Sequence, residues 1–231
     1  MNDCYEWRRY TDFGHDVIIG YVDGEGKKVG CWKKWWVSEY SSPLEYRLHY
    51  KDDKLHGVCE YFREDGSVDH IATYKEGELD GLYKEFYYDD LRRGGWTCGY
   101  YEKGKKNGLW TTYLAGGVEV ASKGYYKDDK KAGHWMEFFH FTDSSDADAK
   151  VFLKHMKKRD KRYLLSFHAF GNYNEEGNRD GVWVVCSYAN PKAKGIVIFE
   201  NGKDITSVES KIRNAKPILH TVMDRYRMKV R

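Results

Sequence analysis

The chain has 231 residues with 39 Lys and Arg against 36 Asp and Glu, a net charge of +3, and 16% of its residues are aromatic. Its mean hydropathy is −0.81, which excludes a thick aliphatic core and favours a thin sheet covered with aromatic rings. No stretch approaches the ~18 apolar residues of a membrane-spanning helix. The charge is uneven, with −7 over residues 1–149 and +10 over residues 150–231, which indicates a basic end that faces an acidic or phosphate-bearing partner.

The cysteines and the first residues indicate an intracellular protein. Five cysteines are scattered along the chain without a CxxC pair: Cys4, Cys31, Cys59, Cys98 and Cys186. This set predicts free thiols and no disulfide framework. The opening sequence MNDCYEWRRY has no apolar run of the kind that a secretory signal contains. We therefore expect a cytoplasmic location.

In chain order, residues 1–19 are expected to form an N-terminal cap, and residues 20–139 repeat one pattern. Residues 74–86 read YKEGELDGLYKEF, residues 101–113 read YEKGKKNGLWTTY, and residues 126–138 read YKDDKKAGHWMEF. One glycine marks each copy: Gly30, Gly57, Gly81, Gly108, Gly133 and Gly181. An aromatic residue stands two positions later in every copy but one, as Trp32, Tyr83, Trp110, Trp135 and Trp183, while Cys59 takes this position in the second copy. A recurring spacing in the range of 20–50 residues is the signature of a repeat architecture.

Each copy has the features of a β-hairpin. Asp and Gly between the aromatic segments tolerate the positive φ of a tight turn, and aromatic residues suit a half-buried strand. The marker glycine permits either a bulge or the close approach of a ring. Trp110 and Tyr113 differ in parity, so either a bulge separates them or both faces of the sheet carry rings. Because a lone hairpin is marginal in water, the hairpins must stack into a mostly-β antiparallel meander.

The pattern Y-x-x-G-x-x-x-G-x-W-x-x-Y, spaced by about 24 residues, resembles the MORN family in its bacterial and large-DNA-virus variant, and the resemblance spans roughly residues 20–202. It implies an elongated, single-layer meander with two strands per repeat. It also implies no catalytic residues and a role as a scaffold or interaction module, with lipid contact in some members and an antitoxin role in some bacterial relatives. A location within a virion is a further implication if the source is viral.

The repeats break at residues 140–162, where an inserted helix with a basic end is expected. Asp and Ser near residue 145 suit a helix start, and Ala149, Phe152, Leu153 and Met156 lie on one helical face. The same start resembles a calcium loop but lacks its central glycine and terminal Glu. The basic end could contact phosphate or an acidic protein, or could be solvated, and contains Lys154, Lys157, Lys158, Arg159, Lys161 and Arg162.

Residues 163–203 are expected to resume the repeats, and residues 204–231 to form a basic helical C-terminal cap or arm. Pro217 suits a first helical turn, and an apolar stripe follows it: Ile218, Leu219, Val222, Met223 and Tyr226. Such a tail would cover the last strand or insert into a partner. Its end is strongly basic, with Arg225, Arg227, Lys229 and Arg231 as possible partner contacts.

No catalytic motif accompanies the repeats. The sequence has no HExxH, GxSxG or P-loop, and its nine histidines are not grouped with Asp or Cys at metal-ligand spacing. We expect no enzyme activity, no cofactor and no metal site. The leading expectation is a structural or scaffolding protein that binds protein partners, with a component of a larger viral assembly as one form of this role. Two alternatives are an antitoxin-like regulatory binder that neutralises an enzyme, and a nucleic-acid or anionic-membrane binder acting through residues 150–231.

Overall fold

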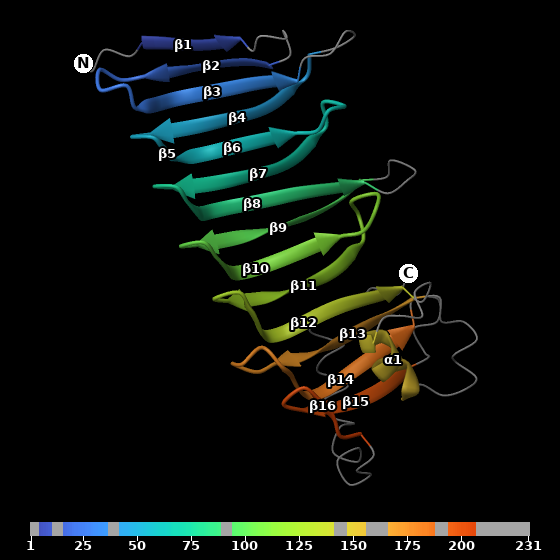
Figure 1. Cartoon of the computed structure of the whole chain (residues 1–231). Coiled ribbons are helices and arrows are strands. Elements are labelled where there is room, and N and C mark those ends of the chain that lie inside the picture. Colours follow the sequence, from blue (N-terminus) through green and yellow to red (C-terminus); the bar gives the residue numbers. More distant parts are fainter. Residues whose placement is uncertain are drawn as a thin grey trace. The chain divides into compact units, whose positions relative to one another are not determined.

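The computed structural model describes residues 5–10, 16–36, 42–88, 94–140, 147–155, 166–187 and 194–206 (Figure 1). The described part is mostly β, with sixteen strands and one short helix. The strands pair antiparallel in chain order, and β5 pairs only with β4. The predicted antiparallel meander of hairpins is therefore confirmed. The chain divides into two compact units, residues 1–107 with 114–118 and residues 108–113 with 119–231.

The first unit contains nine strands. Their bounds are β1 (Tyr5–Tyr10), β2 (Asp16–Val22), β3 (Lys28–Trp36), β4 (Leu44–Lys51), β5 (Lys54–Leu55), β6 (Gly57–Phe62), β7 (Val68–Lys75), β8 (Glu78–Tyr88) and β9 (Gly94–Glu102). Strands β1 and β2 already follow the hairpin pattern of the later strands, although residues 1–19 lack the repeat motif.

The second unit contains the other strands and the helix. Their bounds are β10 (Lys105–Tyr113), β11 (Val120–Lys127), β12 (Lys130–His140), α1 (Ala147–Lys154), β13 (Ser166–Tyr173), β14 (Arg179–Ser187), β15 (Lys194–Glu200) and β16 (Lys203–Asp204). The first residues of β10 belong to the first unit. The predicted C-terminal helices lie in residues 207–231, outside the described residues, and the domain boundaries read from the sequence stay predictions.

The hairpin turns have the backbone that the sequence predicts. In the turn Asp52–Asp53 the two φ angles are 50° and 62°, and in Asp128–Asp129 they are 49° and 68°. Two successive positive φ angles define the type I′ turn, whose twist matches that of the flanking strands. A Gly supplies the second position in three further turns: Glu76–Gly77, Lys103–Gly104 and Asn201–Gly202. Local turn chemistry thus determines where each hairpin reverses.

The marker glycines Gly30, Gly81, Gly133 and Gly181 lie at bulges. All six marker glycines have positive φ, between 62° and 128°. Between β11 and β12 the pairing passes from Gly124↔Trp135 to Tyr125↔Ala132, so Gly133 and its neighbour are left out of the ladder. Nothing lies within 4 Å of a β-carbon built on Gly133. Of the two roles considered for this glycine, the bulge is the one found here, and no ring approaches it.

The tryptophan after each bulge covers a glycine of the preceding strand. A β-carbon on Gly20, Gly124 or Gly171 would lie 2.0–2.2 Å from the indole of Trp32, Trp135 or Trp183, respectively. Each indole Nε1 donates to the carbonyl of the next residue after that glycine, at 3.1 Å to Tyr21, 3.0 Å to Tyr125 and 3.1 Å to Asn172. The bulge therefore tilts the indole flat against the neighbouring backbone and satisfies its one donor.

Alternating tryptophans and tyrosines form a ladder of edge-to-face rings on one face of the second unit. Ring centroids are 5.9 Å apart for Trp110–Tyr126, 5.0 Å for Tyr126–Trp135, 5.9 Å for Trp135–Tyr173 and 5.3 Å for Tyr173–Trp183. Such pairs add to the stability gained from burial. In the first unit the equivalent buried cluster is Trp32, Leu48 and Cys59.

Of the two explanations of the parity problem, rings on both faces of the sheet is the one that the structure supports. The β10–β11 register shifts between Thr112 and Tyr113, but the residue left unpaired is Ala121 of β11, so no extra residue separates Trp110 from Tyr113 in β10. Strand β12 pairs with β13 without a shift, so Phe138 lies on the face opposite Trp135. There its ring packs 5.1 Å from His168.

The inserted helix α1 packs on the ladder face of the second unit. Ala149 and Phe152 are buried, as the predicted apolar stripe requires, while Met156 lies outside the described residues. The Phe152 ring lies 5.7 Å from both Trp183 and Phe199. This packing turns the end of the ring ladder into the largest buried cluster of the described residues.

Candidate functional site

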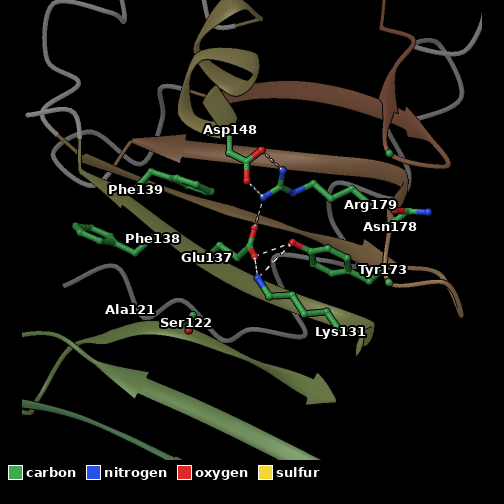
Figure 2. Close-up of a pocket in the computed structure, with 12 residues that line it drawn as sticks. Ala121, Ser122, Lys131, Glu137, Phe138, Phe139, Asp148, Tyr173, Asn178 and Arg179 are labelled. Atoms are coloured by element: carbon green, nitrogen blue, oxygen red, sulfur yellow. Dashed lines mark hydrogen bonds and ion pairs between the residues drawn. The ribbon is translucent and has the colours of Figure 1, made fainter. Parts of the chain in front are cut away.

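A pocket of about 510 Å³ lies in the second unit, on the face that α1 packs against (Figure 2). Strand β12 contributes Lys131 and Glu137, β13 contributes Tyr173, β14 contributes Arg179, and α1 contributes Asp148. Figure 2 shows these polar groups pointing toward one another. The pocket was not predicted from the sequence.

Glu137 is the centre of the polar cluster. Its side chain is buried and accepts hydrogen bonds from Tyr173 Oη at 2.8 Å and Arg179 Nη2 at 2.9 Å, and it also forms an ion pair with Lys131. Arg179 extends the cluster to the helix, because its Nη1 and Nη2 each lie 2.9 Å from a carboxylate oxygen of Asp148. Two anions, two cations and the Tyr173 hydroxyl thus join three strands to α1.

The repeat itself brings two of these cations to the ladder face. Lys131 and Arg179 both stand two residues before a marker glycine, as does Lys28 in the first unit. Lys28 lies 4.7 Å from the ring centroid of Trp32, and Lys131 lies 4.6 Å from that of Trp135. Arg179 lies 5.3 Å from that of Trp183. A cation over the indole is therefore a feature of these three repeats, and in the second unit Glu137 adds a carboxylate to it.

The electrostatics of the cluster keep its charges fixed at neutral pH. Burial by itself raises the pKa of Glu137, but the charges of Lys131 and Arg179 outweigh it, so this pKa lies below its ordinary value. Burial and the Glu137 charge raise the pKa of Tyr173. The ion pairs therefore link helix α1 to the sheet.

A second tie joins the end of α1 to β16. His155 Nε2 lies 2.7 Å from Oδ2 of Asp204, and the Thr206 hydroxyl accepts a hydrogen bond from the Ile198 backbone N–H at 3.0 Å. Burial raises the pKa of Asp204, but hydrogen bonds from Thr206 and His155 outweigh it and lower the pKa to about 2. Asp204 is therefore an anion that secures the last described strand.

The repeat-defining residues are structural in the described part of the chain. Trp32, Trp110, Trp135 and Trp183 are at most 4% exposed, and Tyr83 is half-buried with its ring 5.3 Å from Tyr101. The aromatic residue after each marker glycine thus packs inward.

Most of the predicted basic contacts cannot be placed. Lys154 is described, with an exposed side chain whose Nζ lies 3.6 Å from Oδ2 of Asp204. The others fall outside the described residues: Lys157, Lys158, Arg159, Lys161, Arg162, Arg225, Arg227, Lys229 and Arg231.

Sequence reasoning missed a set of exposed apolar residues in each unit, on the sheet face opposite the buried side chains of the repeat. In the first unit, Val58 and Leu82 each follow a marker glycine by one residue, and Leu82 pairs directly with Tyr100 across β8 and β9. Leu82 is 57% exposed and Tyr100 is 52% exposed. The second unit repeats the arrangement with the exposed pair Leu109 and Tyr125. The signal was present in the sequence, because the residue before the inward aromatic must face the other way.

Comparison with known proteins assigns no family. No family model matches the sequence, and no curated protein matches it. The structure establishes the fold class, which is a long antiparallel meander of β-hairpins consistent with a repeat protein. Over the residues described, no group of His, Cys, Asp and Glu could hold a metal ion, and no helix has the length and apolar character to cross a membrane.

Proposed function

We propose that this protein is a non-enzymatic scaffold of MORN-like hairpins that binds protein partners through the sheet face of its first unit that lies opposite the buried side chains of the repeat. The exposed row of Val58, Leu82 and Tyr100 supports the proposal most directly. Buried aromatic residues are explained by folding, whereas large apolar side chains repeated on one exposed face are typical of interaction surfaces. The MORN-like assignment rests on the repeated glycine and aromatic spacing.

The two faces of the sheet carry different kinds of side chain, and this difference supports a binding role. The ladder face holds the indoles, their cations and α1, and its polar groups are tied in ion pairs. In the first unit, Leu82 and Tyr100 are exposed side by side on β8 and β9, and a tyrosine offers contact area with little conformational entropy to lose. Partner binding would bury this row without disturbing the core.

The test compares partner capture by matched variants. Leu82→Asp and Tyr100→Asp place a charge in the row, while Val118→Asp places the same charge on an 83% exposed loop residue of the same unit. Proteins cross-linked to the native chain in cell extract are identified by mass spectrometry. We expect some to disappear with both row variants and to remain with Val118→Asp, at unchanged melting temperature. Partners that remain bound to all three variants would contradict the assigned face.

The nature of the lost partner separates the alternatives. A partner enzyme that this protein inhibits would support the regulatory-binder function. Loss of binding with rising salt but not with the row variants would instead support a nucleic-acid or anionic-membrane function for residues 150–231.

A further inference from the structure

Strand β1 has a strand neighbour on one side only among the described residues. The order of the sheet begins with β1, and all six of its residues pair with β2. Figure 1 shows β1 as the outermost blue strand, with β2 beside it. An edge strand carries a second row of backbone N–H and C=O groups that another strand can pair with.

At the other end of the strand order, residues of the same chain cover strand β15. In the second unit, β16 pairs with β15, and the Thr206 hydroxyl takes up the backbone N–H of Ile198. The backbone N–H of Ile205 also donates to the Ile198 carbonyl at 2.9 Å. Strand β15 is thus protected by the chain's own following residues, whereas β1 has no strand beyond β2 among the described residues.

The charges of β1 are self-complementary. Glu6 and Arg8 lie two residues apart, pair with Tyr21 and Ile19 of β2, and so share one face. Their side chains are 46% and 53% exposed, and within the chain Arg8 Nη2 lies 2.9 Å from Glu6 Oε1. In an antiparallel pair of two β1 strands centred on residue 7, each Glu6 stands opposite the partner's Arg8. This register keeps corresponding faces continuous across the two sheets.

We infer that β1 is a homodimerisation edge, at which a second copy of this chain adds its own β1 antiparallel and continues the sheet. In the dimer, the exposed contact between Glu6 and Arg8 of one strand is replaced. Two ion pairs form across the strands instead, each between Glu6 of one copy and Arg8 of the other. Opposite charges directly across an antiparallel pair are favourable, and like charges are unfavourable. The acidic residue at position 6 and the basic residue at position 8 therefore favour pairing with a second β1 strand in this register.

Charge-reversal variants of the full chain test the inference by sedimentation velocity. Glu6→Arg leaves two cations and Arg8→Glu leaves two anions, so each variant should repel itself and weaken the dimer by roughly ten-fold or more. An equimolar mixture of these two variants should form a heterodimer, and Glu6→Arg with Arg8→Glu in one chain should restore the homodimer. Circular dichroism checks that every variant is folded.

The matched control is Glu25→Arg, which reverses the same charge in another exposed pair, with Lys27 at 2.6 Å, in the turn between β2 and β3. This control should dimerise like the wild type. A wild-type chain that stays monomeric at high concentration would overturn the inference. So would a dimer that both single variants retain, or a mixture of the two that stays monomeric.

Discussion

The indole of Trp183 lies flat over Gly171, and its Nε1 donates to the carbonyl of the next residue, Asn172, at 3.1 Å. A β-carbon on Gly171 would lie 2.2 Å from the ring, inside any van der Waals contact. The same relationship joins Trp135 to Gly124 and Trp32 to Gly20. One contact therefore explains the tryptophan of these repeats and the glycine that lies opposite it on the preceding strand.

The first prediction follows from this contact. Gly171→Ala forces the Trp183 ring away from the strand, and overpacking of this kind should lower the free energy of unfolding by about 3 kcal/mol. Urea denaturation followed by circular dichroism measures the change. Gly24→Ala is the control, because nothing lies within 4 Å of its β-carbon and its φ is not in the left-handed region. Equal changes in the free energy of unfolding at both positions would show that the indole contact does not stabilise the fold.

The second prediction concerns the two faces of β10. Trp110 is buried and faces Tyr126, whereas its neighbour Leu109 is exposed on the opposite face. Trp110→Ala should destabilise by about 3–5 kcal/mol, and Leu109→Ala by less than about 1 kcal/mol. Thermal melting of both variants checks the difference. An unchanged melting temperature for Trp110→Ala would mean that the ring is a contact residue and not part of the core.

The third prediction concerns Glu137. Replacing it with Gln removes the anion while Lys131 and Arg179 keep their positive charges in a buried setting, so Glu137→Gln should destabilise by about 3–5 kcal/mol. Urea denaturation measures the loss. Glu25→Gln, which removes an exposed anion, should change stability by less than about 1 kcal/mol. A similar small effect for Glu137→Gln would show that the buried cluster adds nothing to the fold.

The fourth prediction is the acid dependence of stability. Glu137 and Asp204 have folded-state pKa values below their ordinary values of 4.5 and 3.8, and that of Asp204 is about 2. A depressed carboxylate pKa contributes stability that is complete above the unfolded-state pKa and is lost as pH falls through the folded-state pKa. The free energy of unfolding should therefore decrease as pH falls from about 5 to about 2.

The Asp204→Asn variant isolates one contribution to this acid dependence. It should be less stable than the wild type at neutral pH and should lose less stability on acidification. Parallel pH curves for the two proteins would contradict the role given to Asp204.

The fifth prediction concerns the thiols. Cys31, Cys59, Cys98 and Cys186 are free, and Cys59 and Cys186 are fully buried. Burial also raises the pKa of Cys59, which lowers its thiolate fraction. Alkylation of the native protein should therefore modify Cys31 and Cys98 before Cys59 and Cys186. Denaturation without reductant should expose five reactive thiols, Cys4 included, and a disulfide-linked peptide in the mass spectrum would contradict the expected reduced state.

The sequence by itself determined the repeat, its turns and the inward direction of its tryptophans. These features are local: Asp52 and Asp53 adopt positive φ within their own hairpin, and Trp110 alternates with Leu109 along one strand. The apolar stripe of α1 was equally readable, because Ala149 and Phe152 are related by the helical period alone.

Only the tertiary structure decided which residues meet across strands. The bulge at Gly133 resets the register of β12, and this places the Trp135 indole over Gly124 of the neighbouring strand and not over a marker glycine. Glu137 meets Arg179, 42 residues away, and Arg179 meets Asp148 of α1. The repeat spacing does not specify these partners, because a sheet register and the position of a docked helix depend on the packing of the whole unit.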